Sequence, residues 1–149
     1  MRYARFGMAK KIRIILDTNW YISAAINKKS RRLFYELLTN PHLKILFCDE
    51  ILIEFKIVIA RSKFLKFVSP GQVTRFINLV APKFENIEIA TKIKRSRDVD
   101  DDFLLSLSVD GNADYLITGD LDLLVLKNQE DTQITRMSEF LTIISHTIQ

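Results

Sequence analysis

Short apolar runs alternate with amphipathic stretches along this chain of 149 residues. A short apolar run is typical of a strand buried on both faces, whereas apolar residues three and four positions apart predict a helix. The apolar runs predict five strands, at residues 12–16, 43–47, 87–89, 115–117 and 133–135. Because strands and helical segments alternate, we expect an α/β fold in which a mostly parallel five-stranded sheet lies between two layers of helices.

Several expected helices have recognisable ends. Serine and aspartate accept hydrogen bonds from the free amides of a helix start, and three such residues are expected N-caps: Ser30, Asp49 and Ser138. The sequence Ser69-Pro70-Gly71-Gln72 predicts a capping box with proline at the first helical position. Two further helices are expected at residues 101–109 and 121–126.

The composition is that of one globular domain. We expect this domain at residues 12–145, after a basic arm at residues 1–11. One cysteine, Cys48, excludes an internal disulfide and cysteine-based zinc sites, which favours a reducing, cytoplasmic location. The sequence predicts neither an export signal nor a membrane span. A net charge of +4 and a pI near 9.2 favour a polyanionic partner.

Four acidic residues lie where strands end or helices begin: Asp17, Glu54, Asp101 and Asp120. Each of them alone has an ordinary alternative explanation as a helix cap, a turn former or a solvated surface residue. Asp101 is preferred over the other acids of 98–102. It lies three residues before Leu104 and seven before Ser108, so all three share one helix face.

Together, these acids predict a metal site. Ligands of such folds bind at the carboxyl ends of the strands. Carboxylates that meet there repel each other by about 4 kcal/mol per close pair at an effective dielectric of about 20. The cluster therefore requires a cation or raised pKa values. Oxygen donors suit Mg²⁺ or Mn²⁺, and one or two such ions activate water and stabilise charge on a phosphoryl group. This chemistry favours phosphodiester hydrolysis.

Two basic clusters are candidates for contact with a backbone of phosphates. The first cluster follows the first expected helix: Lys28, Lys29, Arg31 and Arg32. The second precedes the acidic run: Lys92, Lys94, Arg95 and Arg97. The alternative for each cluster is an ordinary solvated face.

Four segments together resemble the PIN-domain nucleases: 15–19 (ILDTN), 51–55 (ILIEF), 97–105 (RDVDDDFLL) and 113–124 (ADYLITGDLDLL). The resemblance runs from about Ile12 to Ile144 and is greatest to a prokaryotic branch described as toxins of toxin–antitoxin pairs, related to the VapC toxins. It implies a Mg²⁺- or Mn²⁺-dependent ribonuclease. The family's acidic positions fall on these residues: Asp17, Glu54, Asp101 and Asp120, with Asp122 as a frequent extra.

The resemblance also implies supporting residues and partners. Asn19 and Thr118 match polar companions expected to orient Asp17 or water. RNA, an antitoxin encoded nearby and a second copy of the chain are the implied partners. The sequence departs from the family pattern at Val99, where proline is frequent, and at Ser106 and Ser108, where alanine is usual.

Two other functions stay open. One is a PIN-like interaction module without turnover, although an interface alone has no need for mutually repelling acids. The other is an aspartyl-phosphate phosphohydrolase with Asp17 as its nucleophile. Asn19 argues against it, since that chemistry resembles the haloacid-dehalogenase-like family, which has an acid two residues after the nucleophile.

Overall fold

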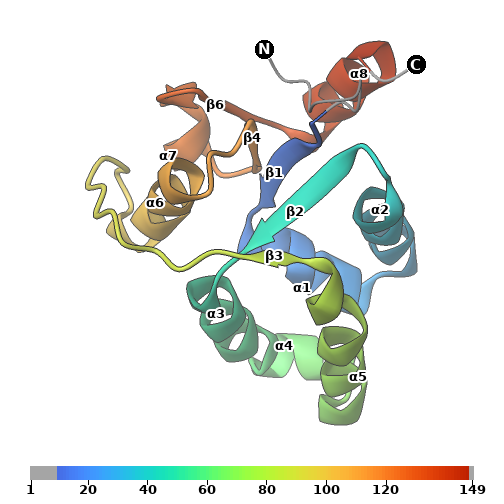
Figure 1. Ribbon diagram of the computed structural model, residues 1–149. Coiled ribbons are helices and arrows are strands. Elements are labelled where there is room, and N and C mark those ends of the chain that lie inside the picture. Colours follow the sequence, from blue (N-terminus) through green and yellow to red (C-terminus); the bar gives the residue numbers. More distant parts are fainter. Residues whose placement is uncertain (1–9, 148–149) are drawn as a thin grey trace.

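The chain forms one mixed sheet with helices packed around it (Figure 1), as described by a computed structural model of residues 10–147. The strands of this part of the chain are β1 (Ile12–Leu16), β2 (Leu43–Phe47), β3 (Glu85–Asn86), β4 (Tyr115–Ile117), β5 (Asn128–Gln129) and β6 (Thr132–Thr135). Their spatial order is β3-β2-β1-β4-β6-β5. All neighbouring pairs are parallel except β5 and β6. The predicted α/β architecture is confirmed, with six strands instead of five.

Eight α-helices and two 3₁₀ turns follow within the same residues. The helices are α1 (Thr18–Ile26), α2 (Lys28–Thr39), α3 (Asp49–Ile59), α4 (Ser62–Leu65), α5 (Pro70–Val80), α6 (Asp102–Asp110), α7 (Leu121–Leu124) and α8 (Met137–Thr147). The 3₁₀ turns are η2 (Ala81–Lys83) and η3 (Val99–Asp101). In Figure 1, α6 and α7 lie on one side of the sheet and α2 and α8 on the other, while α3, α4 and α5 extend beyond the carboxyl ends of β1 and β2. None of the helices described here is both long and apolar enough to cross a membrane.

Three of the five predicted strands have the expected bounds, namely β1, β2 and β4. The predicted strand at 133–135 is β6, which begins one residue earlier. The sixth strand, β5, was not predicted; it forms a short antiparallel hairpin with β6. The predicted arm at 1–11 lies almost entirely outside the described residues.

The predicted strand at 87–89 is wrong, because the strand of this region is β3 at residues 85–86. The Ile87 amide still donates to the Phe47 carbonyl oxygen of β2 at 2.8 Å, but from Ala90 onward the amides bond to a helix. Residues 87–96, here called the strap, have no regular secondary structure and run along α6. Three side chains of α6, one per helical turn, accept hydrogen bonds from strap amides. Asp110 accepts from Ala90 and Thr91 at 2.7 and 2.9 Å, Ser106 accepts from Ile93 at 3.0 Å, and Asp102 accepts from Arg95 and Ser96 at 3.0 and 2.7 Å. An extended backbone needs partners for its amides, and here these side chains supply them.

The helix caps differ from several predictions. The capping box of Ser69 and Gln72 is confirmed. Asn27, not Ser30, caps α2, since its side chain accepts the hydrogen bond of the Ser30 amide. Asp49 and Ser138 are not caps, because each already lies inside the first turn of its helix.

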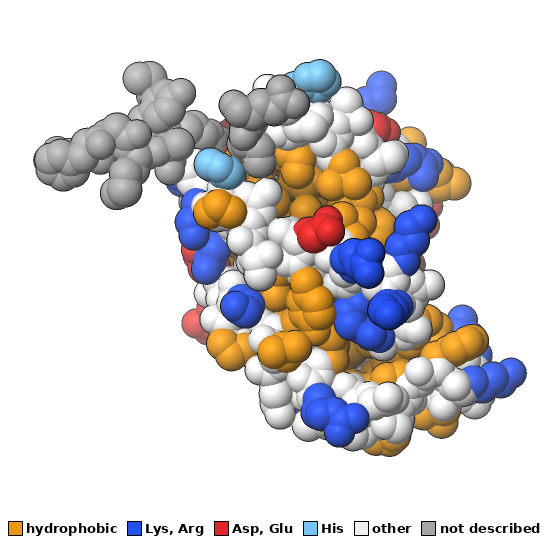
Figure 2. All heavy atoms as spheres, turned by 90° about the vertical axis from the view of Figure 1, so that its right-hand side faces the viewer, with side chains coloured by type: hydrophobic (Ala, Val, Ile, Leu, Met, Phe, Trp, Pro, Cys, Tyr) orange, Lys and Arg blue, Asp and Glu red, His pale blue; other side chains and the backbone are white. Residues whose placement is uncertain are grey.

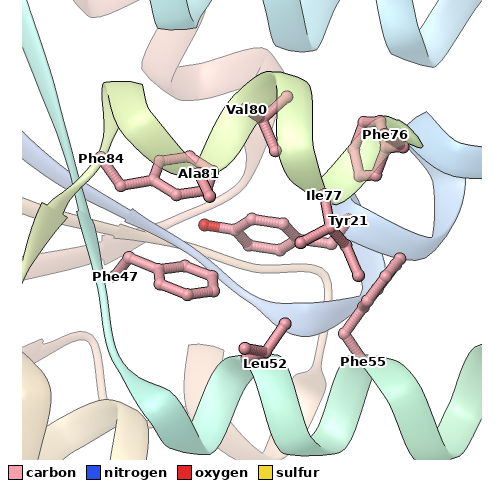
Figure 3. A pocket seen from close by; sticks show the side chains of 9 residues that line it. All are labelled: Tyr21, Phe47, Leu52, Phe55, Phe76, Ile77, Val80, Ala81 and Phe84. Carbon is pink, nitrogen blue, oxygen red and sulfur yellow. The ribbon is translucent and has the colours of Figure 1, made fainter. Parts of the chain in front are cut away.

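An aromatic cluster on the α1 side of the sheet joins the first half of the chain. The Tyr21 ring packs against Phe34, Phe47 and Phe84 with ring centres 5.2, 5.7 and 5.8 Å apart. Figure 3 shows the Tyr21 hydroxyl pointing toward Phe47 and Phe84. All three residues line a cavity of about 40 Å³. The hydroxyl has no hydrogen-bond partner among the described residues, and burial raises its pKa well above 10.0.

We expect Gly111→Ala to lower the free energy of unfolding by about 1–3 kcal/mol, the usual cost of overpacking. An added Cβ at this buried position would lie 2.7 Å from the Leu46 side chain and 3.0 Å from the Leu107 carbonyl oxygen. Gly71→Ala is the matched control, because a Cβ added there would have its nearest neighbouring atom 4.0 Å away. Urea denaturation measures both variants, and equal stabilities would contradict this packing argument.

The ion pair of Arg13 with Glu85 gives a second prediction. Arg13 on β1 reaches both Glu85 and the Gly111 carbonyl oxygen, and its hydrogen bonds lower the pKa of Glu85 below 4.5. A lowered folded-state pKa stabilises the protein above the unfolded value, and the effect is lost as pH falls through the folded value. We expect Glu85→Gln to cost less than about 1 kcal/mol at pH 7, since the pair is partly exposed. Denaturation at several pH values should show the difference from wild type closing below pH 4.5; a constant difference would contradict it.

Candidate functional site

The site begins where the adjacent parallel strands β1 and β4 end. Leu16 pairs with Ile117 in this register, and the Asp17 amide donates to the Ile117 carbonyl oxygen at 3.1 Å. The next residues on the two strands, Asp17 and Thr118, therefore lie side by side. In the strand order, β2 is the neighbour of β1 on one side and β4 is its neighbour on the other. The gap between β1 and β4 is therefore the switch in strand order, where ligands of open α/β sheets bind.

Asp17 is a buried carboxylate that is not used as a helix cap. Only 5% of its surface is exposed. It occupies the N-cap position of α1, but its side chain makes no capping hydrogen bond and instead accepts from the Thr118 hydroxyl at 2.5 Å. Burial raises the pKa of Asp17 above 3.8, and the Thr118 hydroxyl partly offsets this. Its other oxygen, Oδ1, is buried without a hydrogen-bond partner among the described residues.

Thr118 connects Asp17 to Asp120. The Thr118 hydroxyl oxygen accepts from the Asp120 amide at 3.0 Å while it donates to Asp17. Asp120 in turn accepts from the Asp122 amide at 2.9 Å and thereby caps α7. For Asp120, the capping role and the site role are therefore combined.

Asp101 lies at the end of η3, directly before α6, and is partly buried. Burial together with the neighbouring Asp120 carboxyl raises its pKa to about 8, with smaller contributions from Asp98 and Glu54. Asp120 raises the pKa of Asp101 both through a side-chain hydrogen bond and through its charge. The Asp101 Oδ2 atom is also buried without a partner among the described residues.

The structure thus brings together most of the predicted acids. Glu54, partly buried on α3, acts on Asp101 through its charge, as does Asp120, and Thr118 links Asp120 to Asp17. Asp122 differs from these acids, because its carboxylate forms an ion pair with Arg97 at 2.9 Å. Asn19 lies exposed in the first turn of α1, and its side chain has no hydrogen bond within residues 10–147.

Two residues of the site were missed by the sequence reasoning. The Thr18 hydroxyl is buried and has no partner among residues 10–147. Asp98 raises the pKa of Asp101 while it caps η3 through the Asp100 amide. Both residues stand in the segments that carry the family resemblance, but they were considered only as helix caps. Buried polar atoms without partners are rare in folded proteins and call for an explanation.

The residues suit a divalent cation by chemistry and only in part by geometry. All available donors are oxygens, and two buried carboxylate oxygens lack partners among the described residues. Yet no group of three or more His, Cys, Asp or Glu side chains within the described part of the chain is arranged to hold an ion. Binding an ion here therefore requires some of these side chains to move.

The predicted phosphate-binding cations are unequally available. Arg31 donates to the carbonyl oxygens of Ala24 and Ala25, and so caps the end of α1. Arg95 donates to the carbonyl and side-chain oxygens of β5, and Arg97 pairs with Asp122. The remaining predicted cations are exposed: Lys28, Lys29 and Arg32 on α2, and Lys92 and Lys94 on the strap.

Comparisons with known proteins agree with this arrangement. A family model described as PIN domain matches residues 13–122, which is most of the chain. A solved structure of VapBC2 from Rickettsia felis, bound to a DNA fragment from its promoter, contains a chain of similar fold. The match has a TM-score of 0.56 at 17% identity and covers 83% of this chain and 97% of that chain. Among curated proteins, none matches this sequence.

We expect Asp101→Asn to raise the free energy of unfolding in chelator by about 1 kcal/mol. Substitutions that remove an unfavourable interaction at a functional site commonly stabilise a protein by this amount. The neutral amide removes the repulsion with Asp120 while it keeps the shape of the side chain. Asp100→Asn is the matched control, because that neighbouring acid is exposed and such substitutions change stability by about 0.5 kcal/mol or less. Urea denaturation in EDTA compares the two; an unchanged or lower stability of Asp101→Asn would contradict the repulsion.

Proposed function

Since the chain belongs to the PIN domain family, we propose that it is a divalent-metal-dependent endoribonuclease that hydrolyses RNA phosphodiester bonds. The observation that carries this proposal is the set of crowded carboxylates at the switch point, with the Asp101 pKa raised to about 8 beside Asp120. Such crowding is unfavourable unless a cation or a proton compensates it. An RNA substrate is consistent with the cytoplasmic location that we propose for the enzyme.

Each acidic residue has a role in this proposal. Asp101 and Asp120 form the centre of the ion site, and Asp17 and Glu54 complete it from β1 and α3. A bound Mg²⁺ or Mn²⁺, or a pair of them, would supply an activated water and stabilise the charge on the phosphoryl group. Thr118 holds one Asp17 oxygen, and the other, Oδ1, has no hydrogen-bond partner among the described residues, so we assign it to the ion. Outer hydrogen bonds of this kind fix the orientation of ligands.

We further propose that the protein is the toxin of a toxin–antitoxin pair. The similar chain in the VapBC2 complex supports this proposal, and so does an apolar surface on α3, α4 and α5. Exposed apolar side chains on and beside these helices include Ile57, Leu65, Phe67 and Leu79. Residues 55–84 contain six Lys or Arg and no Asp or Glu. Figure 2, which views the side of α2 and α5, shows basic and apolar side chains intermingled. An acidic antitoxin segment fits this surface better than a second copy, so we expect a homodimer to use another face.

The nuclease is tested by RNA cleavage with Mn²⁺, Mg²⁺ or chelator. We expect wild type to cleave only with metal. Thr118→Val removes a partner of a ligand and should lower the rate about 10- to 100-fold, the usual cost of such a loss. Asp17→Asn changes a ligand itself and should lower the rate by at least about 100-fold. Asp131→Asn, an exposed acid in the turn between β5 and β6, is the matched control and should keep full activity.

Two outcomes would refute this proposal: equal cleavage in chelator, or full activity of Asp17→Asn. Hydrolysis of a generic phosphomonoester in place of RNA would favour a phosphatase. Ion binding has a readout apart from turnover, because Mn²⁺ should raise the melting temperature of wild type more than that of Asp101→Asn.

A further inference from the structure

A groove leads along the strap toward the acidic residues. It has a volume of about 690 Å³ and lies between the strap, the first two turns of α6 and the start of α3. Asp102, which follows Asp101, and Glu50, one turn before Glu54, both line it. The site acids themselves are not among the residues that line the groove, but two of them, Asp101 and Glu54, lie on the same two segments as these lining residues.

The strap is held rigidly in one orientation. Its amides bond to Asp102, Ser106 and Asp110, which are spaced four residues apart on α6. Alternate side chains of this extended segment then point inward or outward. Ile89 and Ile93 are partly buried, whereas Lys92 and Lys94 are exposed.

Two lysines are the free cations of this groove. Arg95 and Arg97 of the same region are held by β5 and by Asp122. Lys92 and Lys94 both line the groove, and neither has an ion pair or a side-chain hydrogen bond within residues 10–147. They are two residues apart on an extended chain, so both project to the same side.

The lining fits a single nucleic-acid strand. Val99, 74% exposed, and the partly buried Phe103 provide apolar surface beside the lysines. Single strands bind through cations that contact phosphates and apolar or aromatic side chains that contact bases. A double helix keeps its bases paired inside, so it would leave this apolar surface without a contact.

We propose that the groove binds single-stranded RNA, with Lys92 and Lys94 on its phosphates and Val99 and Phe103 against its bases. This inference rests on the proposed nuclease function and names the substrate class and its path to the site. The α2 cluster is the rival surface. It lies at the far end of α1, a nine-residue helix, and hence about 13 Å from Asp17.

The test is binding of a fluorescein-labelled single-stranded RNA of about 12 nucleotides, within the usual range of such sites. Fluorescence anisotropy in EDTA at several salt concentrations measures affinity without cleavage. We expect Lys92→Ala/Lys94→Ala to weaken binding about tenfold and to reduce the salt slope by about 1.4, the value for two lost phosphate contacts on a single strand. Lys92→Arg/Lys94→Arg should retain the affinity.

Lys28→Ala/Lys29→Ala removes the same charge from α2 and should weaken binding much less. Equal losses in the two alanine pairs, a larger loss in the α2 pair, or no RNA binding by wild type would each overturn the inference. Competition by duplex RNA as strong as by single strands would also overturn it, as would binding of polyglutamate in place of RNA. Thermal melting shows that each variant is folded. Wild type that binds through the strap but cleaves nothing with Mn²⁺ would refute the nuclease and leave the groove assignment intact.

Discussion

The pairing of β1 with β4 is the constraint on which the candidate site depends. These strands are separated by about 100 residues in sequence, yet their register sets Leu16 opposite Ile117. The contacts of the candidate site begin with the next residue on each strand. Asp17 and Thr118 become neighbours, and the Thr118 hydroxyl then links Asp17 to the Asp120 amide. A slip by one residue would turn each side chain to the opposite face of the sheet and separate the acids.

Burial and repulsion at this position oppose stability. Asp17 is nearly inaccessible, and Asp101 sits against Asp120 in a way that favours protonation. The fold resists this strain by rigid placement, because each acid stands at the boundary of a strand or helix whose apolar residues pack in the core. Buried and mutually repelling charged groups of this kind are found preferentially at functional sites. Tyr21 is a weaker example of an unfavourably buried polar group. Its hydroxyl has no partner among the described residues, and the residue lines a small cavity.

The local sequence pattern correctly predicted the strands that pair with other strands and the helix start that is capped by its own neighbouring residues. Strands β1, β2 and β4 are apolar runs inside the sheet, and the capping box at Ser69 is a self-contained motif. The pattern failed where long-range partners decide. Residues 87–89 alternate as a strand does, but only Ile87 bonds to β2, and from Ala90 onward the amides bond to side chains of α6. The β5 hairpin was missed because its turn lacks glycine. Glu130 in the turn and Lys127 directly before β5 adopt positive φ angles instead.

The site was predictable in the same uneven way. The positions of the acids follow from strand ends, and Asp101 could be separated from its neighbours by helix face. The partners of the cations could not be predicted, because they come from distant segments. Arg31 belongs to a basic run in the sequence, yet its guanidinium caps α1. Asp102, one of the acids to which Asp101 was preferred, is buried and holds the strap.

Helix α6 therefore joins two functions that the sequence presents as separate. Polar side chains on successive turns of α6 accept hydrogen bonds from the strap and hold it along the helix. Asp101 lies at the N-terminus of the same helix, within the candidate site. The serine at position 106, where the resemblance implies alanine, is one of these polar residues and has a partner in the Ile93 amide. The strap bonds to side chains of α6 and Asp101 directly precedes that helix, so one helix positions both. A strand of RNA aligned by the strap would hence meet Asp101 at a fixed place along its backbone, which is the condition for cutting at a defined phosphate.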